Sequence, residues 1–437
     1  MKIFRVVLIV LATLVAIVSG WYVVKNYHIS LWSGSNRYTD FEAYYKAGER
    51  FNINSDSTYF TPEGTPETGR TYNYPPFAML YFAPLAKLGY VGAYSVFSIL
   101  SLVASFVITF IVLRIMKEYF IPPTRGQTIF SYILTASFAP IWQDMKHGQV
   151  NELVAMCAMI FLWFLLKQKY GVAALVLFMG FWLKIYSALL GVFVLPFLFA
   201  GSAIYARFKI KAPAWKIVLI FIIALVVPPL VVSVFVPLDL YSFYFTNFLP
   251  RLSGVTNLSG LNQSLYGIVA RITNDVGNLA SWKFVPLAPW MKIGGMLFTL
   301  LALGLVCKQI WRGSVQKFIV TAYIFMAVIP IISQYGWEYV YVFALPIVLH
   351  VMLRVFSERS FSRYTIYAVL GLILFWIPKP SDGFIESTVV RFSPFFYHVF
   401  FARWIIASIL FCMAAYGYFK LKDKNDKEIS LGGTANS

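Results

Sequence analysis

Long apolar segments recur along this chain from one end to the other, and no extended polar block separates them. Most are near the roughly 20 residues that a helix needs to cross a bilayer. Open strands cannot satisfy their backbone groups in lipid, and the runs do not alternate as barrel strands do. We therefore predict an all-α polytopic membrane protein with about twelve transmembrane helices, over residues 3–24, 92–116, 127–142, 149–167, 171–183, 185–203, 215–237, 288–310, 316–333, 338–356, 364–378 and 397–420.

Composition and charge support one integral domain. Of 437 residues, 59% are hydrophobic and 12% are charged, whereas soluble domains average about 45 to 50% apolar. The net charge of +18 does not indicate nucleic acid as a partner, because most Lys and Arg residues lie in short loops between apolar runs. The membrane domain is expected over 1–421, followed by a tail, 422–437, that is charged and then small and polar and is expected to be disordered.

The positive charges predict how the chain is oriented. Loops rich in Lys and Arg face the cytoplasm, and this places both termini there, as an even number of spans requires. The opposite, extracytoplasmic face of the cell (inner) membrane then carries the long loops 25–91 and 238–287. In the first loop, apolar residues at helical spacing over 41–48 predict an interfacial helix, and the short apolar run that ends at Lys87 predicts a second.

Asp40 follows the first apolar segment and is the first candidate for chemistry. Thr39 and Glu42 have the spacing of a capping box, which would leave Asp40 in the first helical turn. A carboxylate held ionised at a positive helix end suits a general base. The alternative is that Asp40 is only a helix N-cap. Glu42 is interpreted as structural, with a secondary base or metal role as the alternative, and it is counted among the candidate substrate-binding residues.

Other polar residues gather on the same predicted face. Tyr74, within the stiff segment Tyr72-Asn73-Tyr74-Pro75-Pro76, either starts a helix rigidly or forms a wall for a sugar or prenyl chain. Gln149 and Asn151 enter a predicted span, where buried amides need partners such as sugar hydroxyls or helix contacts. His147 lies beside them and is either a substrate contact or a solvated residue.

Lys184 stands between two apolar segments, away from the basic loops. An ionisable residue in such a place is a functional hypothesis by default. It would bind a lipid phosphate, or it would simply extend its amine to the interface. Further candidates on this face are Arg251 and Arg271 for phosphate, and four residues for substrate: Asn262, Gln263, Trp337 and Glu338. No zinc-ligand spacing, P-loop or serine nucleophile elbow is present.

Taken in order, these motifs resemble one family. An Asp after the first span, Tyr-x-Tyr-Pro-Pro, Gly-Gln-x-Asn, a rim Lys, Asn-Gln-Ser with a later Arg, and Ser-x-x-x-Trp are similar to glycosyltransferase family 87, the polyprenyl-phosphate-mannose-type transferases of the GT-C class. The resemblance covers roughly residues 1–360. It implies a GT-C-like bundle with extracytoplasmic juxtamembrane helices, in which Asp40 matches the family's catalytic Asp.

The implied reaction is inverting transfer of a mannose-like sugar from a polyprenyl-phosphate donor to a hydroxyl of a glycolipid or glycan acceptor. Asp40 would deprotonate that hydroxyl, while Lys184 and an Arg of the loop 238–287 would steady the leaving phosphate. No cofactor is implied, and a divalent metal is not expected because a lipid monophosphate leaves.

Two positions depart from the family pattern. Ile185 stands where Pro usually follows the rim lysine, and Tyr339 stands where His is usual, so the acceptor is expected to differ from those of the mannose-transferring members. The alternative function is a transporter or flippase of lipid-linked sugars. A transporter should show paired broken segments in two related halves, and no such repeat is evident.

Overall fold

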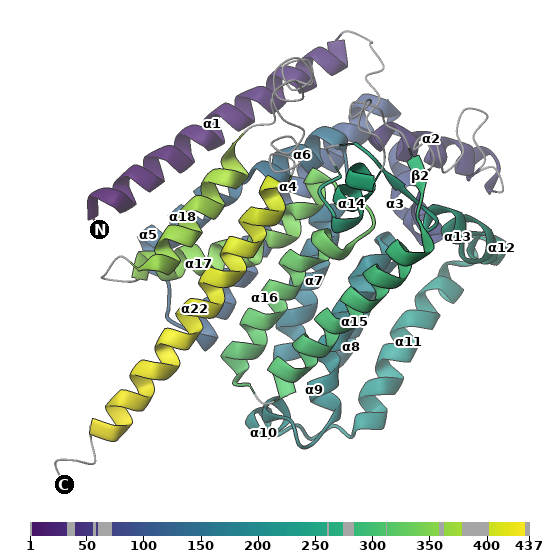
Figure 1. Cartoon of the computed structure of the whole chain (residues 1–437). Helices are drawn as coiled ribbons and strands as arrows, with labels where there is room; N and C mark the ends of the chain where they lie inside the picture. Colours follow the sequence, from purple (N-terminus) through teal and green to yellow (C-terminus); the bar gives the residue numbers. More distant parts are fainter. Residues whose placement is uncertain are drawn as a thin grey trace.

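The computed structural model describes residues 2–32, 40–55, 58–59, 72–259, 262–273, 284–311, 313–357, 362–377 and 402–432. Within them the chain folds into helices that pack side by side, with one small two-stranded sheet near one end (Figure 1). The longer helices are α1 (Lys2–Trp32), α4 (Gly89–Tyr119), α5 (Arg125–Ala136), α7 (Asn151–Leu166), α8 (Tyr170–Leu183), α11 (Ala214–Val232), α15 (Pro289–Trp311), α16 (Val315–Ile332), α17 (Leu345–Ser357), α18 (Arg363–Trp376) and α22 (Arg403–Gly432).

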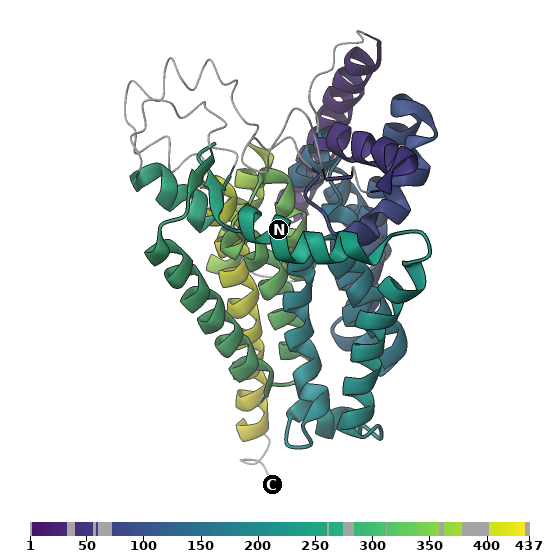
Figure 2. The ribbon, with the colours of Figure 1, turned by 90° about the vertical axis from the view of Figure 1, so that its right-hand side faces the viewer.

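Short elements gather at the two ends of this bundle (Figures 1 and 2). One end holds α2 (Asp40–Ile53), η3 (Pro76–Ala78), α3 (Met79–Ala86), α6 (Ala139–His147), α12 (Leu238–Phe243), η5 (Tyr244–Phe248), α13 (Leu249–Leu252), α14 (Leu265–Thr273) and the antiparallel pair β1 (Val255–Asn257) and β2 (Phe284–Pro286). The other end holds α10 (Ala203–Phe208). The 3₁₀ segments η4 (Ile185–Val194), followed by α9 (Leu195–Leu198), and η6 (Glu338–Ala344) complete the described elements.

The distribution of apolar surface is that of a protein in lipid. Among the described residues, five helices are long and apolar enough to cross a membrane: Gly89–Tyr119, Ala214–Val232, Pro289–Gln309, Val315–Ile332 and Glu338–Ser357. Only 11% of the most apolar stretch of Pro289–Gln309 is buried inside the protein, whereas 89% of that of Glu338–Ser357 is buried. Large apolar side chains of Pro289–Gln309 therefore face outward. Soluble monomers rarely expose such continuous apolar surface. The predicted all-α polytopic membrane fold is confirmed.

Each of the twelve predicted spans coincides with a helix or a pair of helices, although their number as full crossings stays a prediction. Both helices expected in the long loop after the first span are present as α2 and α3, whereas the side of the membrane on which they lie stays a prediction. Thr39 lies outside the described residues, so the capping box stays a prediction.

Three details differ from the sequence-based prediction. The span 127–142 is broken between α5 and α6 by an extended Phe138 followed by Pro140 at the second helical position, because a proline favours a helix start and not its interior. The tail expected to be disordered from residue 422 continues α22 to Gly432, and its sequence places opposite charges four residues apart, which supports a helix. The loop 238–287 contains the short β1–β2 pair.

Gly148 joins α6 to α7 and sets the distance between α6 and α2. It adopts the left-handed conformation, with φ 65° and ψ 43°, and Gln149 N donates to Asp144 O over 3.0 Å as in a Schellman turn. A Cβ atom built at this position would lie 2.4 Å from Cβ of Phe41. Only glycine allows α2, and with it the neighbouring Asp40, to approach this turn so closely.

We expect Gly148→Ala to lower the free energy of unfolding by about 2 kcal/mol, because alanine meets both the left-handed backbone penalty and the contact with Phe41. The matched control is Gly126→Ala on α5, where a Cβ meets nothing within 4 Å. Thermal unfolding in detergent compares the two variants. Equal melting temperatures would show that the turn yields without displacing α2.

Candidate functional site

Asp40 is the first residue of α2, and its partly buried carboxylate meets the α6–α7 turn. Phe41, the next residue, is fully buried among Tyr90, Tyr94 and Phe97, with ring centroids 5.2 to 5.8 Å away. This apolar anchor fixes the first turn of α2. Gln149 Nε2 donates to Asp40 Oδ2 at 2.5 Å, which orients the carboxylate.

Gln149 links Asp40 to two further groups. Its Oε1 accepts a hydrogen bond from the hydroxyl of Tyr74 at 2.7 Å and a longer one from Nζ of Lys184 at 3.4 Å. The hydroxyls of Tyr74 and Tyr44 are 2.7 Å apart. Burial raises the pKa of both phenols well above the usual value, so they remain protonated. A hydrogen-bonded chain therefore runs from Tyr44 through Tyr74 and Gln149 to Asp40, and such chains hold their members in one geometry.

Lys184 reaches this network from a break between two helices. It ends α8 in an extended conformation, with φ −156° and ψ 116°, before η4 begins. Its Nζ donates to Oδ1 of Asn151 at 2.8 Å, and the same oxygen accepts a hydrogen bond from the hydroxyl of Tyr186. Asn151 Nδ2 in turn donates to Oδ1 of Asp144 at 2.5 Å. The lysine is thus held over a fully buried amide and carboxylate.

Burial is the largest influence on the pKa values of Lys184 and Asp144 in this network. It lowers the pKa of Lys184 to about 8, against the opposing attraction of Asp144 and then Asp40. It raises the pKa of Asp144 well above the usual value, although the hydrogen bond from Asn151 and the charge of Lys184 oppose it. A lysine with this pKa is mostly protonated at neutral pH, so the site presents one ammonium group beside the Asp40 carboxylate.

Aromatic rings extend the site away from Asp40. Nζ of Lys184 lies 5.9 Å from the centroid of the Tyr339 ring, and this ring contacts His147, with centroids 5.4 Å apart, and Trp337, at 6.3 Å. Trp337 and Tyr335 follow with nearly parallel rings, 6.4 Å apart and 7° between planes. Tyr335 and Trp337 are partly exposed. Tyr335 and Trp337 alternate along the extended stretch before η6, and Tyr339, in the first turn of η6, stacks on Trp337. The three rings therefore form one row.

The opposite side of this segment is anchored in protein. Glu338 is buried and pairs with Arg403 at 3.0 Å, and Nε2 of Gln263 donates to the same Oε1 at 3.1 Å. Gly336 packs so closely that an added Cβ would lie 2.2 Å from the carbonyl oxygen of Pro330. A buried ion pair with an additional donor holds its members firmly. The aromatic row is therefore a rigid surface, and Glu338 lies behind it.

Of the remaining predicted residues, Asn262 and Arg271 stabilise the loop 238–287, and Arg251 and Glu42 lie on the surface. Asn262 bridges to Trp337 through an isolated β-bridge, and its Oδ1 accepts hydrogen bonds from Gly336 N and from the hydroxyl of Ser264. Arg271 is buried, and its Nη1 donates to the carbonyls of Ser259 and Asn262, each at 2.8 Å. Arg251 is exposed on α13. Glu42 pairs with Lys46 at 2.9 Å on the surface of α2.

The structure thus brings together one group of the predicted residues: Asp40, Tyr74, His147, Gln149, Asn151 and Lys184. A second group, Gln263, Glu338, Asn262 and Trp337, forms or supports the aromatic row. Sequence reasoning missed Tyr44, Tyr186 and Arg403 as members and did not single out Asp144. Asp144 had a visible signal, since it lies among other polar residues between two apolar runs.

In the described part of the chain, no group of three or more His, Cys, Asp or Glu side chains is placed to hold a metal ion. The prediction that no divalent metal is required stays a prediction. Chemically, the network offers a carboxylate to accept a proton and a nearby ammonium group to attract an anion.

Comparison with curated proteins finds no match. A sequence profile of glycosyltransferase family 87 matches residues 72–333, which is more than half of the 437 residues. The match includes Tyr74, Gln149, Asn151 and Lys184, whereas Asp40 and Trp337 lie outside it. This multi-pass membrane protein therefore belongs to glycosyltransferase family 87.

Proposed function

We propose that the protein is an inverting glycosyltransferase that moves a sugar from a polyprenyl-phosphate donor to a hydroxyl of a glycolipid or glycan acceptor at the extracytoplasmic face of the cell (inner) membrane. The observation that supports it most is the meeting of Asp40, Gln149 and Lys184, from three separate elements, in one hydrogen-bonded network. Family membership supports the transfer of a sugar. The donor, the acceptor and the role of Asp40 are the parts proposed here.

In this mechanism Asp40 removes the proton from the acceptor hydroxyl as its oxygen attacks the anomeric carbon. The bond from that carbon to the phosphate oxygen breaks, and the negative charge develops on the lipid phosphate. We assign the Lys184 ammonium group to the stabilisation of that charge, because Lys184 and Asp40 are hydrogen bonded to the same side-chain amide of Gln149. Inversion follows from a single displacement at the anomeric carbon.

The test is transfer by purified protein in lipid nanodiscs. A polyprenyl-phosphate sugar labelled in its sugar is supplied with membrane lipid extract, and both labelled product and free polyprenyl phosphate are measured. Equal amounts of the two are expected. Movement of the intact donor between leaflets, without a new glycoside, would instead identify a carrier of lipid-linked sugars.

The row of Tyr335, Trp337 and Tyr339 is assigned to the acceptor. A rigid aromatic ring offers a flat apolar face to the C–H face of a sugar. We expect Trp337→Ala to raise the KM for the acceptor about tenfold, equivalent to about 1.4 kcal/mol, with a smaller effect on kcat. Trp290→Ala is the matched control, because Trp290 is 56% exposed on α15. An unchanged acceptor KM in the Trp337 variant would remove the row from the acceptor site.

A further inference from the structure

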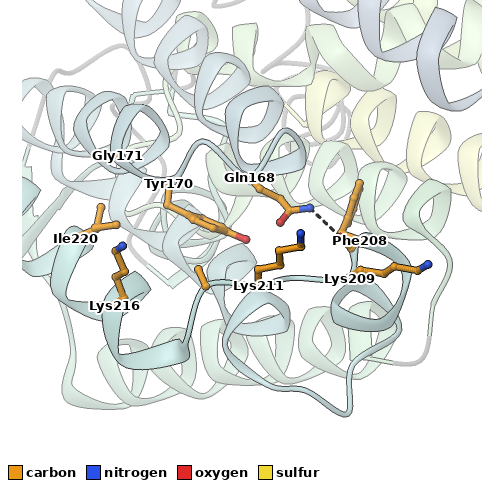
Figure 3. A pocket seen from close by; sticks show the side chains of 9 residues that line it. Gln168, Tyr170, Gly171, Phe208, Lys209, Lys211, Lys216 and Ile220 are labelled. Atoms are coloured by element: carbon orange, nitrogen blue, oxygen red, sulfur yellow. Dashed lines mark hydrogen bonds between the residues drawn. The ribbon is translucent and has the colours of Figure 1, made fainter.

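A cavity lies at the opposite end of α8 from Lys184, near α10 (Figures 1 and 3). Its volume is about 550 Å³, within the range of roughly 300 to 1,000 Å³ typical of ligand pockets. The turn between α7 and α8, the turn between α10 and α11, and the first turns of α11 form its walls. The fourteen residues of α8 separate it from the Asp40 network by about 20 Å.

The cavity is strongly basic. Lys209, Lys211 and Lys216 line it, and no acidic residue does. All three lysines are exposed, and no ion pair involves them in the described part of the chain. Figure 3 shows Lys209 extending away from the other two lysines. The ammonium groups of Lys211 and Lys216 repel one another unless an anion lies between them. The charge of the cavity therefore points to an anionic ligand.

The polar groups inside the cavity also point to a ligand. Tyr170 is only 7% exposed, and its hydroxyl has no hydrogen-bond partner in the described residues. Figure 3 shows this hydroxyl directed into the cavity, on the side where Lys211 and Gln168 extend their polar ends. A buried hydroxyl without a partner costs free energy, and an anion bound among these lysines would accept its hydrogen bond.

The walls are held in an unusual backbone conformation. Gln168 and Lys209, with φ of 55° and 47°, are the two non-glycine residues with positive φ in the described chain, and both line this cavity. Nε2 of Gln168 donates to the carbonyl of Phe208 at 3.0 Å and ties the two turns together. Strained backbone of this kind concentrates at ligand sites.

The surroundings identify the anion as part of a lipid. Above the cavity, the face of α11 that carries Lys216 and Ile220 continues with exposed apolar residues, Leu219, Ile223 and Val227, at 43 to 48% exposure. Trp215, in the first turn of α11, is 67% exposed, and tryptophan at a helix end is typical of the headgroup level. A phospholipid could thus lay its acyl chains along α11 with its headgroup in the cavity.

We propose that this cavity binds the phosphate-bearing headgroup of an anionic phospholipid, in the leaflet opposite to the Asp40 network. Lys211 and Lys216 contact the phosphate, and the Tyr170 hydroxyl donates a hydrogen bond to it. The cavity is larger than one phosphate group fills, which leaves room for a glycerol or another polar headgroup. This site is separate from the proposed sugar transfer and does not depend on it.

The experiment compares lipid binding by wild type and variants in nanodiscs of phosphatidylcholine with increasing phosphatidylglycerol. Bound phosphatidylglycerol is counted by native mass spectrometry, and thermal stability is recorded. We expect Lys211→Gln/Lys216→Gln to weaken retention at least about tenfold and Tyr170→Phe by a few-fold. Lys211→Arg/Lys216→Arg should retain the lipid. Equal stability in pure phosphatidylcholine checks that the variants fold.

The control is Arg207→Gln, which removes an exposed positive charge from α10 beside the cavity but outside its lining. It should keep wild-type retention. A loss equal to that of the double variant would mean that general surface charge attracts the lipid, and it would overturn the proposal. Inorganic phosphate and glycerol phosphate are tested in separate arms. Stabilisation by either that matches phosphatidylglycerol would assign the cavity to a soluble anion and would also overturn it.

Discussion

Asp40→Asn is expected to lower kcat for sugar transfer by about 10³-fold, within the 10² to 10⁴ that a general base typically contributes, and to change the donor KM little. Asparagine keeps the size of the side chain and an oxygen that accepts the hydrogen bond from Gln149. It cannot take a proton from the acceptor hydroxyl. Single-turnover transfer of label from saturating donor measures this step without product release.

The matched control is Glu49→Gln, which makes the same chemical change on an exposed position of α2. Its rate should equal that of the wild type. A general base is the wrong role for Asp40 if the asparagine variant transfers sugar at a rate close to the wild type. Loss of α2 packing is distinguished from loss of the base by thermal unfolding, which should be unchanged in Asp40→Asn.

The sequence could predict that Gln149 and Asn151 need partners, because amides that enter an apolar helix must be hydrogen bonded. It could not say which partners. In the folded chain these amides bond largely to other site residues, with Gln149 between Asp40 and Lys184 and Asn151 between Lys184 and Asp144. Both amides therefore position charged groups. That depends on the left-handed turn at Gly148, which hydropathy alone does not reveal.

The segment from Gln334 to Tyr339 contains a sequence pattern, aromatic residues at every second position, that the prediction of substrate residues did not use. Aromatic residues alternate there with Gln334, Gly336 and Glu338. Alternation of this kind separates the two sides of an extended chain, which this segment is up to Trp337, before η6 begins at Glu338. Trp337 and Glu338 were grouped as substrate residues, yet they face opposite ways. The partner of Glu338, Arg403, is 65 residues away in sequence, and no local pattern connects them.

Charge placement did not predict the surroundings of the arginines. Arg271 was expected to hold a phosphate, and its guanidinium group instead lies buried against two carbonyls of its own loop. Arg251 is on the surface of α13. The polar surroundings of Lys184 were easier to anticipate, because a lone cation between two apolar runs has few ways to satisfy its charge except a polar site. Lys184 is the cation that the structure joins to Asp40 through Gln149.

Lys184→Met is expected to lower kcat/KM for the donor by about 10²-fold, since removing one group that stabilises developing negative charge typically costs 10² to 10³. Methionine keeps most of the side-chain length and removes the ammonium group. Lys87→Met is the control, because it removes an exposed charge after α3, near the same end of the bundle. Equal losses in the two variants would indicate a general electrostatic effect and not a role at the site.

The pH dependence of kcat/KM distinguishes a Lys184 whose positive charge acts on the donor phosphate from a Lys184 that is merely structural. Burial lowers the pKa of Lys184 to about 8, so its charged form is lost as the pH rises above that value. We expect kcat/KM to fall about tenfold per pH unit on this alkaline side. In Lys184→Arg the guanidinium group stays charged throughout this range, and the alkaline fall should disappear even if the rate is lower overall. A wild-type profile that stays level well above pH 8, or an arginine variant that keeps the fall, would assign the titration to another group.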